Sequence, residues 1–406
     1  MRKAAWGLLL LFIFAIPWEY SLDLGEPLGN VARLAGLVLM LVAIPAVLQS
    51  GRLRPPGALQ WVVLAFFLWF CCSCFWTIDQ AVTLTRMRAY FQEMMIVWLV
   101  WEFAESPLHL RSMLRAFVAG SWVLAILTLA NFASPQSIAE GQVRFVAYGQ
   151  DPNDVARFLD LGLPLAALSL NSETRWPARL LAVGYLPLGL VAVLLTASRG
   201  GFLAALLALA GCIVLLMRSH GRIVLAGVYS LPVLAAGLWF TVPHQTFERL
   251  ATIPELLARG DLNQRSNIWS AGWHAFIRAP ILGTGAGSFV GAAGLSPIDT
   301  AHNTVLNILV GGGLCALFLA IAILALAARS VLQAHGPLRI ALATALLVWT
   351  MTAMVASVEE SRTTWFLIAL IALAGRLAED EPSMLAECFP EPQQTAKFEV
   401  TSKQTA

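Results

Sequence analysis

Two short stretches contain side chains whose types suit chemistry at a membrane surface. Arg199, in "LLTASRGGFLAALLAL", stands between two apolar runs with no acidic residue near it in sequence, and His302 opens the apolar run in "DTAHNTVLNILVGGGL". A guanidinium is a permanent cation, and an imidazole can accept a proton near neutral pH. Gly200 and Gly201 would let other backbone or a ligand approach closely. His302 is equally well explained as a polar residue at a helix entry beside an Asn303 cap.

The composition indicates which kind of protein must position these residues. Of 406 residues, 58% are hydrophobic and only 12% are charged, so a soluble domain would expose large apolar patches. Apolar runs of about 17–25 residues, the length of a bilayer-spanning helix, recur along the chain. We therefore predict an all-α polytopic membrane protein. The net charge of +2 gives no bulk electrostatic argument for nucleic acid.

The basic residues orient the predicted spans. We predict twelve spans, near residues 4–18, 31–49, 58–76, 89–105, 113–132, 155–170, 180–197, 201–217, 223–242, 303–327, 340–357 and 363–378. Every second gap carries an arginine pair: Arg52 and Arg54, Arg111 and Arg115, Arg175 and Arg179, Arg218 and Arg222, Arg329 and Arg339. Basic loops face the cytoplasm, so both termini are predicted to be cytoplasmic. The transmembrane domain would cover residues 1–378, and the polar tail 379–406 is predicted to be disordered.

The long gap 243–301 would then lie outside the cytoplasm. "TFERLATIPELLARG" predicts a short helix that ends at Gly260. "NQRSNIWSAGWHAF" places Trp269, Trp273 and Phe276 on one helical face, as in a helix lying at the lipid interface. "GTGAGSF" is expected to form a flexible turn. It is not a dinucleotide-binding motif, because its glycine spacing does not fit and no strand precedes it.

The outer face also collects arginines, against the positive-inside bias. They are Arg86, Arg88, Arg144, Arg199, Arg249, Arg259, Arg265, Arg278 and Arg362. Interfacial anchoring is an alternative explanation for many of them. Asp151, Asn153 and Asp154 are expected to cap a helix rather than to bind metal. The six cysteines show neither a disulfide frame nor a zinc spacing. No cofactor and no metal site are expected.

The order of these features resembles a known family. The chain has a span ending in Ser-Arg-Gly, then an outer loop with R-x-x-x-W and P-x-L-G-x-G, and then His-Asn opening a span that ends in glycines. Over about residues 140–320, this order resembles that of the O-antigen ligase and polymerase superfamily. The O-antigen ligase is favoured, with a fold like that of C-type glycosyltransferases. The resemblance implies transfer of a glycan from undecaprenyl pyrophosphate to the lipid A core at the periplasmic face of a Gram-negative inner membrane. The family's functional positions carry over to Arg199, Arg265 and His302.

The resemblance also implies roles for these residues. The arginines would hold the leaving pyrophosphate without a metal, and His302 would take the proton of the acceptor hydroxyl, so that the anomeric carbon is inverted. Further contacts to pyrophosphate or glycan are expected from Arg86, Arg88, Arg144 and Asn303. Glu359, Glu360 and Arg362 either position His302 or an arginine, or form a plain ion-pair cluster.

Three other functions compete with the ligase. An O-antigen polymerase uses the same donor with another lipid-linked glycan as acceptor, and a protein O-oligosaccharyltransferase uses serine or threonine. A transporter of inorganic carbon belongs to a different class. Transporters tend to show internal repeats and ionisable residues at the bilayer midplane. The sequence shows no repeat, and its outer charges gather at one rim, which favours an enzyme whose partners are lipid-linked glycan, lipid A core and membrane lipids.

Overall fold

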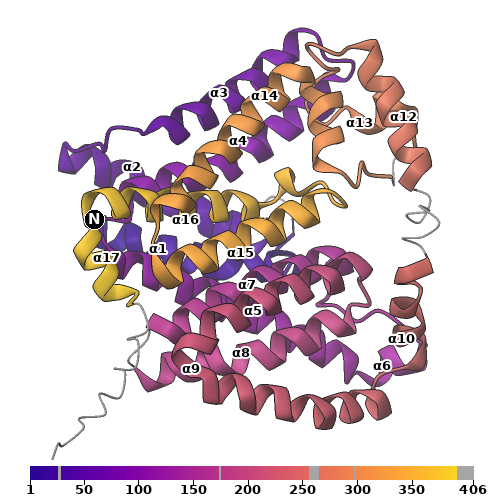
Figure 1. Cartoon of the computed structure of the whole chain (residues 1–406). Coiled ribbons are helices and arrows are strands. Elements are labelled where there is room, and N and C mark those ends of the chain that lie inside the picture. The colour runs from indigo at the N-terminus through magenta and orange to yellow at the C-terminus, as the bar shows by residue number, and fades with distance from the viewer. Residues whose placement is uncertain (26–28, 173–174, 256–264, 297–298, 391–406) are drawn as a thin grey trace, which may run out of the picture.

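The chain folds as a bundle of helices (Figure 1). The computed structural model describes all residues except 26–28, 173–174, 256–264, 297–298 and 391–406. Within the described residues the only β-type pairing is an isolated bridge between Asp23 and Asn30, which confirms the predicted all-α class. The elements are α1 (Arg2–Ala15), η1 (Ile16–Ser21), α2 (Val31–Ser50), α3 (Ala58–Cys72), η2 (Ser73–Phe75), α4 (Gln80–Phe103), α5 (Pro107–Phe132), α6 (Pro135–Ala139), α7 (Pro152–Ser172), α8 (Trp176–Leu195), α9 (Arg199–Thr241), α10 (His244–Ala251), α12 (Arg265–Arg278), α13 (Phe289–Ala293), α14 (Thr304–Gln333), α15 (Gly336–Ala353), η3 (Val358–Glu360), α16 (Arg362–Asp380) and α17 (Pro382–Cys388).

Many of these helices are long and apolar enough to cross a membrane. Among the described residues there are eight such segments: Arg2–Ser21, Val31–Ser50, Ala58–Phe75, Pro107–Phe132, Trp176–Leu195, Arg199–Met217, Thr304–Gln333 and Gly336–Ala353. The pair Ser219–Gly227 and Pro232–Thr241, bent by 42°, makes a ninth if it is one span. The chain is thus of the polytopic membrane type. The other three predicted spans fall on α4, α7 and α16, and their crossing of the membrane stays a prediction.

Helices α7 and α16 lie inside the bundle rather than at its surface. α7 packs against α5, α8, α9 and α15, and α16 packs against α4 and α14. Nearly all residues of both helices are buried, including the charged Arg157, Asp160 and Arg376. Because protein rather than lipid surrounds these helices, they can carry polar residues that lower the hydropathy of the segment.

Loops predicted to share a membrane side do share an end of the bundle. Arg2 at the start of α1 donates to the Glu102 carboxylate at 2.8 Å, and Arg376 near the end of α16 donates to the Trp101 carbonyl at 3.0 Å, both near the end of α4. Figure 1 shows the N-terminus and α17 at the left, and α6, α10, α12 and α13 at the right. Which end faces the cytoplasm stays a prediction.

The glycine-rich segment after α12 is fixed, so the expectation of a flexible turn was wrong. Helix α14 is broken at Gly313, whose φ is +65°. The backbone N–H groups of Thr284 and Gly285 donate to the carbonyls of Val310 and Gly311 at 2.8 and 2.9 Å. The glycines of α14 admit this loop and also lie against Phe70 of α3, because a backbone without Cβ atoms can approach a neighbouring segment closely and share its hydrogen bonds.

The predicted interfacial helix is α12, but its aromatic residues do not share one exposed face. Trp269 is partly buried and donates its indole N–H to the Ala301 carbonyl at 3.0 Å. Phe276 is buried, and both residues belong to the cluster that joins α12 to α13 and α14. Only Trp273 of the three is half exposed, at 50%. Packing on protein thus accounts for two of the three residues, and the position of α12 at a lipid interface stays a prediction.

The predicted helix 246–260 and the predicted tail are described only in part. The first begins within α10, which ends at Ala251; helix resumes after Thr252 at residues 253–255, and the predicted end at Gly260 lies outside the described residues. The tail expected to be disordered from Glu379 continues α16 to Asp380 and then forms α17. The tail is ordered there because Leu385 and Phe389 are buried, while residues 391–406 lie outside the described part.

Candidate active site

One cavity gathers four of the residues that the sequence singled out. It has a volume of about 420 Å³, and Arg144, Arg199, Arg265 and His302 all line it. Its walls come from α7, the start of α9, α10, the start of α12, the end of α15 and the loops between them. The other polar residues in its lining are Asn153, Arg157, Ser198, Arg249, Asp299 and Thr352.

Helices α7, α9, α12 and α14 all begin at or next to this cavity. Asn153 is the second residue of α7, Arg199 is the first of α9, and His302 lies two residues before α14. The N-terminus of a helix carries a partial positive charge from its backbone N–H groups and favours anions. A cation at such a position is unfavourable unless an anion compensates it. The placement of Arg199 therefore points to a negatively charged ligand.

Arg199 is held in place by Arg249, which the sequence placed only among the outer arginines. The Arg199 Nε donates to the Arg249 carbonyl at 3.1 Å, and the Arg249 Nε donates to the Ala197 carbonyl at 3.1 Å. Each bond uses the Nε hydrogen and does not engage the two terminal nitrogens of the guanidinium. Those terminal nitrogens are the pair that binds two phosphate oxygens at once.

Arg144, a predicted substrate-binding residue, is fixed by the same turn. Its Nε donates to the Thr196 carbonyl at 3.1 Å, and a terminal nitrogen donates to the Asn153 Oδ1 at 3.2 Å. The Ser198 hydroxyl donates to the same Asn153 oxygen at 2.9 Å. Burial, and then the charge of Arg249, lower the pKa of Arg144 to about 10. Burial and the neighbouring arginine together thus disfavour the charged form even of a guanidinium.

Arg157 in α7 is the functional candidate that the sequence analysis missed. Its side chain is only 4% exposed and forms an ion pair with the Asp154 carboxylate at 3.0 Å. Its Nε and Nη1 have no hydrogen-bond partner among the described residues, although Arg157 lines the cavity. A buried donor without a partner is unfavourable. An anionic ligand in the cavity would supply the missing acceptors, and the signal in the sequence was an arginine inside a predicted span.

His302 has an unusual backbone conformation. Its φ is +46°, and Ala197 has a φ of +48°; no other non-glycine residue in the described part of the chain has a positive φ. His302 lines the cavity, and Ala197 directly precedes Ser198, which also lines it. Left-handed conformations in non-glycine residues tend to occur at functional sites, where surrounding structure enforces them. Both exceptions adjoin one cavity, which marks it as a functional site.

The surroundings of His302 favour its neutral form. Burial and the charge of Arg265 lower the pKa of His302 below its usual value of 6.5, while Asp151, Asp154 and Asp299 act in the opposite direction. A neutral imidazole has a free ring nitrogen that can accept a proton. His302 is thus poised as a proton acceptor at neutral pH.

Asn303 does not line this cavity. Its Oδ1 accepts from the Leu306 N–H at 2.9 Å, and its Nδ2 donates to the Met354 carbonyl at 3.3 Å. Asn303 is therefore the cap of α14, as expected from its position beside His302. Its predicted contact with substrate has no support in this arrangement.

Arg86 and Arg88, both on α4, also lie outside the cavity lining. Arg86 forms an ion pair with Glu360 at 2.8 Å, and Arg88 is exposed. Arg362 pairs with Glu19, and Glu359 accepts from the Asn307 amide, so Glu359, Glu360 and Arg362 belong to a cluster of ion pairs and hydrogen bonds. The structure thus separates this cluster from the cavity that contains His302.

The acidic residues near the cavity act as helix caps and ion-pair partners. The Asp151 carboxylate accepts from the Asn153 N–H at 2.7 Å, which is the predicted capping contact at the start of α7. Within the described residues, no group of three or more His, Cys, Asp or Glu side chains could hold a metal ion. Arginines are thus the cations that the described chain offers to an anion in this cavity.

Part of the chain matches a known protein family. The family model described as O-Antigen ligase matches residues 184–321, a segment that contains Arg199, Arg249, Arg265 and His302. Arg144 and Arg157 lie outside that segment. No curated protein sequence matches the chain.

Proposed function

With residues 184–321 assigned to the O-antigen ligase family, we propose that the protein is an O-antigen ligase. It would transfer a glycan from undecaprenyl pyrophosphate to a sugar hydroxyl of the lipid A core. The reaction would take place at the periplasmic face of a Gram-negative inner membrane. The family match supports a membrane enzyme that transfers glycans. The arginines that line the cavity support a donor that carries a pyrophosphate.

The observation that carries the proposal is the charge of the cavity lining. Five arginines line it (Arg144, Arg157, Arg199, Arg249 and Arg265), against Asp299 as the one carboxylate among the described lining residues. Such a group needs a ligand with several negative oxygens, and a pyrophosphate provides them. Guanidinium groups hold phosphate through paired donors and stabilise the charge that grows on a leaving pyrophosphate.

His302 would perform the proton transfer. The acceptor sugar hydroxyl attacks the anomeric carbon of the donor glycan as the His302 imidazole takes the hydroxyl proton. The bond between the anomeric carbon and the pyrophosphate oxygen breaks, and the electron pair leaves with the pyrophosphate held by the arginines. Direct displacement inverts the anomeric carbon. Since pyrophosphate is already a good leaving group, no carboxylic acid is required to protonate it, unlike in glycosidases.

Reconstitution tests the proposal. The purified protein in liposomes is given undecaprenyl pyrophosphate-linked glycan together with lipid A core, and the products are separated by mass and by lipid extraction. We expect glycan joined to lipid A core, in excess chelator as well as with magnesium. Longer glycan that is still linked to undecaprenyl pyrophosphate, with unmodified lipid A core, would indicate a polymerase. Absence of any glycan transfer would contradict the proposal.

A further inference from the structure

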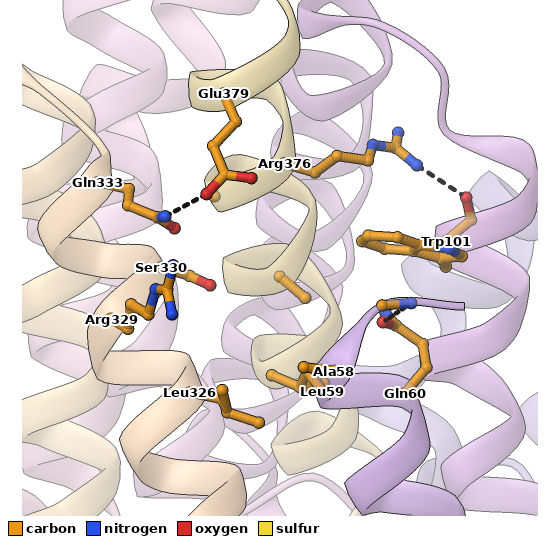
Figure 2. A pocket seen from close by; sticks show the side chains of 13 residues that line it. Ala58, Leu59, Gln60, Trp101, Leu326, Arg329, Ser330, Gln333, Arg376 and Glu379 are labelled. Atoms are coloured by element: carbon orange, nitrogen blue, oxygen red, sulfur yellow. Dashed lines mark hydrogen bonds between the residues drawn. The ribbon is translucent and has the colours of Figure 1, made fainter. Parts of the chain in front are cut away.

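A second cavity lies at the opposite end of the bundle from His302. It has a volume of about 220 Å³ and is formed by the start of α3 and the ends of α4, α14 and α16 (Figure 2). In Figure 2, Arg329 and Glu379 lie on one side, and Trp101 and Gln60 lie on the other. Neither the family match nor the proposed transfer reaction assigns a role to this cavity.

Two deeply buried side chains present hydrogen-bond donors without partners here. Gln60 is 1% exposed, and its Oε1 accepts from the Gly57 N–H at 3.1 Å. Its amide orientation is set by that bond, and its Nε2 has no partner among the described residues. Arg376 is 9% exposed; it donates to the carbonyls of Trp101 and Ala104, and its Nε also has no partner in the described chain. Both residues line the cavity, so a ligand with acceptor oxygens would satisfy them.

The first turn of α3 adds backbone donors to the same cavity. Gly57, Ala58, Leu59 and Gln60 all line it. The Gln60 side chain accepts from the Gly57 N–H, and the N-cap residue Gly57 has no side chain to accept from the N–H groups of the first turn. The first N–H groups of a helix have no partner within the helix and attract anions. The donors of α3 and the two buried side chains therefore favour the same kind of ligand.

The charged residues of the lining leave the cavity positive. Arg376 and the exposed Arg329 are the two cations, and Glu379 is the one carboxylate among the described lining residues. Gln333 donates its amide to Glu379, so part of this acidic group is already engaged. A singly charged anion matches the resulting balance.

Apolar side chains beside the cavity place it at a lipid surface. Trp61 follows Gln60 and is 56% exposed, and Leu332 precedes Gln333 and is 71% exposed. Leu326, also in the lining, lies further along α14 from its end. The indole of Trp101 stacks on the Arg376 guanidinium at 4.7 Å, and such aromatic residues are enriched at membrane interfaces. A ligand here would have its anionic group among the donors and apolar chains beside α14.

We propose that this cavity binds the phosphate headgroup of an anionic phospholipid in the leaflet opposite the active site. The phosphate oxygens accept hydrogen bonds from Arg376 Nε, Gln60 Nε2 and the first turn of α3, while Arg329 contributes charge at the rim. The acyl chains lie along the exposed apolar side chains of α3 and α14. Binding at this site does not depend on the proposed transfer reaction.

Native mass spectrometry of the full chain in detergent tests the proposal, with phosphatidylglycerol as the probe. We expect Arg329→Gln to weaken retention of the lipid about fivefold, the effect of about one arginine near an anionic lipid surface. Arg339→Gln is the matched control, because Arg339 is exposed at the start of α15, at the same end of the bundle, and does not line the cavity. Its binding of the lipid should equal that of the wild type.

A second variant separates binding from folding. Gln60→Glu keeps an oxygen to accept from the Gly57 N–H but replaces the free donor with a negative charge, so lipid retention should be lost while the thermal unfolding temperature stays near wild type. Equal lipid binding by Arg329→Gln and Arg339→Gln, or full binding by a folded Gln60→Glu, would overturn the site. Displacement of the lipid by sn-glycerol 1-phosphate at equal concentration would show that the occupant is a soluble phosphate and that the lipid assignment is wrong.

Discussion

Arg199 and Arg249 hold one another through the backbone. The Nε of Arg199 donates to the carbonyl of Arg249, and the Nε of Arg249 donates to the carbonyl of Ala197, two residues before Arg199, both at 3.1 Å. The two bonds tie the start of α9 to α10 and bring two like charges into one cavity. Such an arrangement is unfavourable without an anion, and this motivates the first prediction.

Arg199→Lys should lose most transfer activity, and Arg199→Ala should lose more. Lysine keeps the charge but has no Nε hydrogen for the Arg249 carbonyl and no planar pair of donors for phosphate. Transfer rates are compared at equal membrane expression. If Arg199 only anchored the helix at the interface, lysine would serve nearly as well, because its ammonium can reach the headgroups. Near-normal activity of the lysine variant would therefore rule out bidentate binding of the pyrophosphate.

Arg157→Met should reduce the transfer rate by about 10²–10³-fold, the usual effect of removing one donor that stabilises developing charge. It should not destabilise the protein, because methionine fills a buried site and removes two donors that lack partners in the described structure. The checks are transfer rate and thermal unfolding of the purified protein. A variant with full activity would show that Arg157 serves only its ion pair with Asp154.

His302→Asn should abolish most transfer, by about 10²–10⁴-fold, while the protein folds normally. Asparagine tolerates the left-handed backbone conformation of His302 but cannot act as a base near neutral pH. His302→Ala should be equally inactive and also less stable, because alanine is strained at this φ. Activity of His302→Asn near the wild-type rate would reduce His302 to a structural residue at the entry of α14.

The transfer rate should fall with decreasing pH, with a midpoint below 6.5. The base must be neutral, and burial and Arg265 lower the pKa of His302, so the imidazole stays neutral to a lower pH than an ordinary histidine. Asp299→Asn removes a charge that raises this pKa, so it should move the midpoint further down. The measurement is kcat/KM against pH for both proteins. A midpoint above 6.5, or an upward shift in Asp299→Asn, would contradict the assignment.

Membrane orientation can be tested with single cysteines in a variant that lacks the six native ones. Ala251 and Ser219 are both exposed; Ala251 ends α10, and Ser219 is next to the kink of α9 at His220. Cysteine at position 251 should react with a membrane-impermeant thiol reagent added from outside, and cysteine at position 219 should not. The reverse pattern would place the arginine cavity on the cytoplasmic side and exclude a periplasmic reaction.

Local features of the sequence were enough to predict the helices and several elements of the site. Apolar length alone located the eight long apolar segments and the bent pair that could make a ninth span in the described chain, and the boundary expected between Arg218 and Arg222 is the kink of α9 at His220. Alternation of the spans brought Arg199, Arg265 and His302 to one end of the bundle. This worked because the hydropathy of a helix and the side on which it ends are properties of consecutive residues.

Only the tertiary structure decided which residues share the cavity and which helices are enclosed. Arg157 and Arg249 line the cavity because segments far apart in sequence pack together. Arg86 instead forms an ion pair with Glu360, and Asn303 caps α14. The same packing buries α7 and α16, orders α17 and docks the glycine loop into α14. A hydropathy value depends only on the type of a residue and not on its actual neighbours in the fold. Whether that residue meets lipid, protein or ligand is determined by neighbours that only the folded bundle provides.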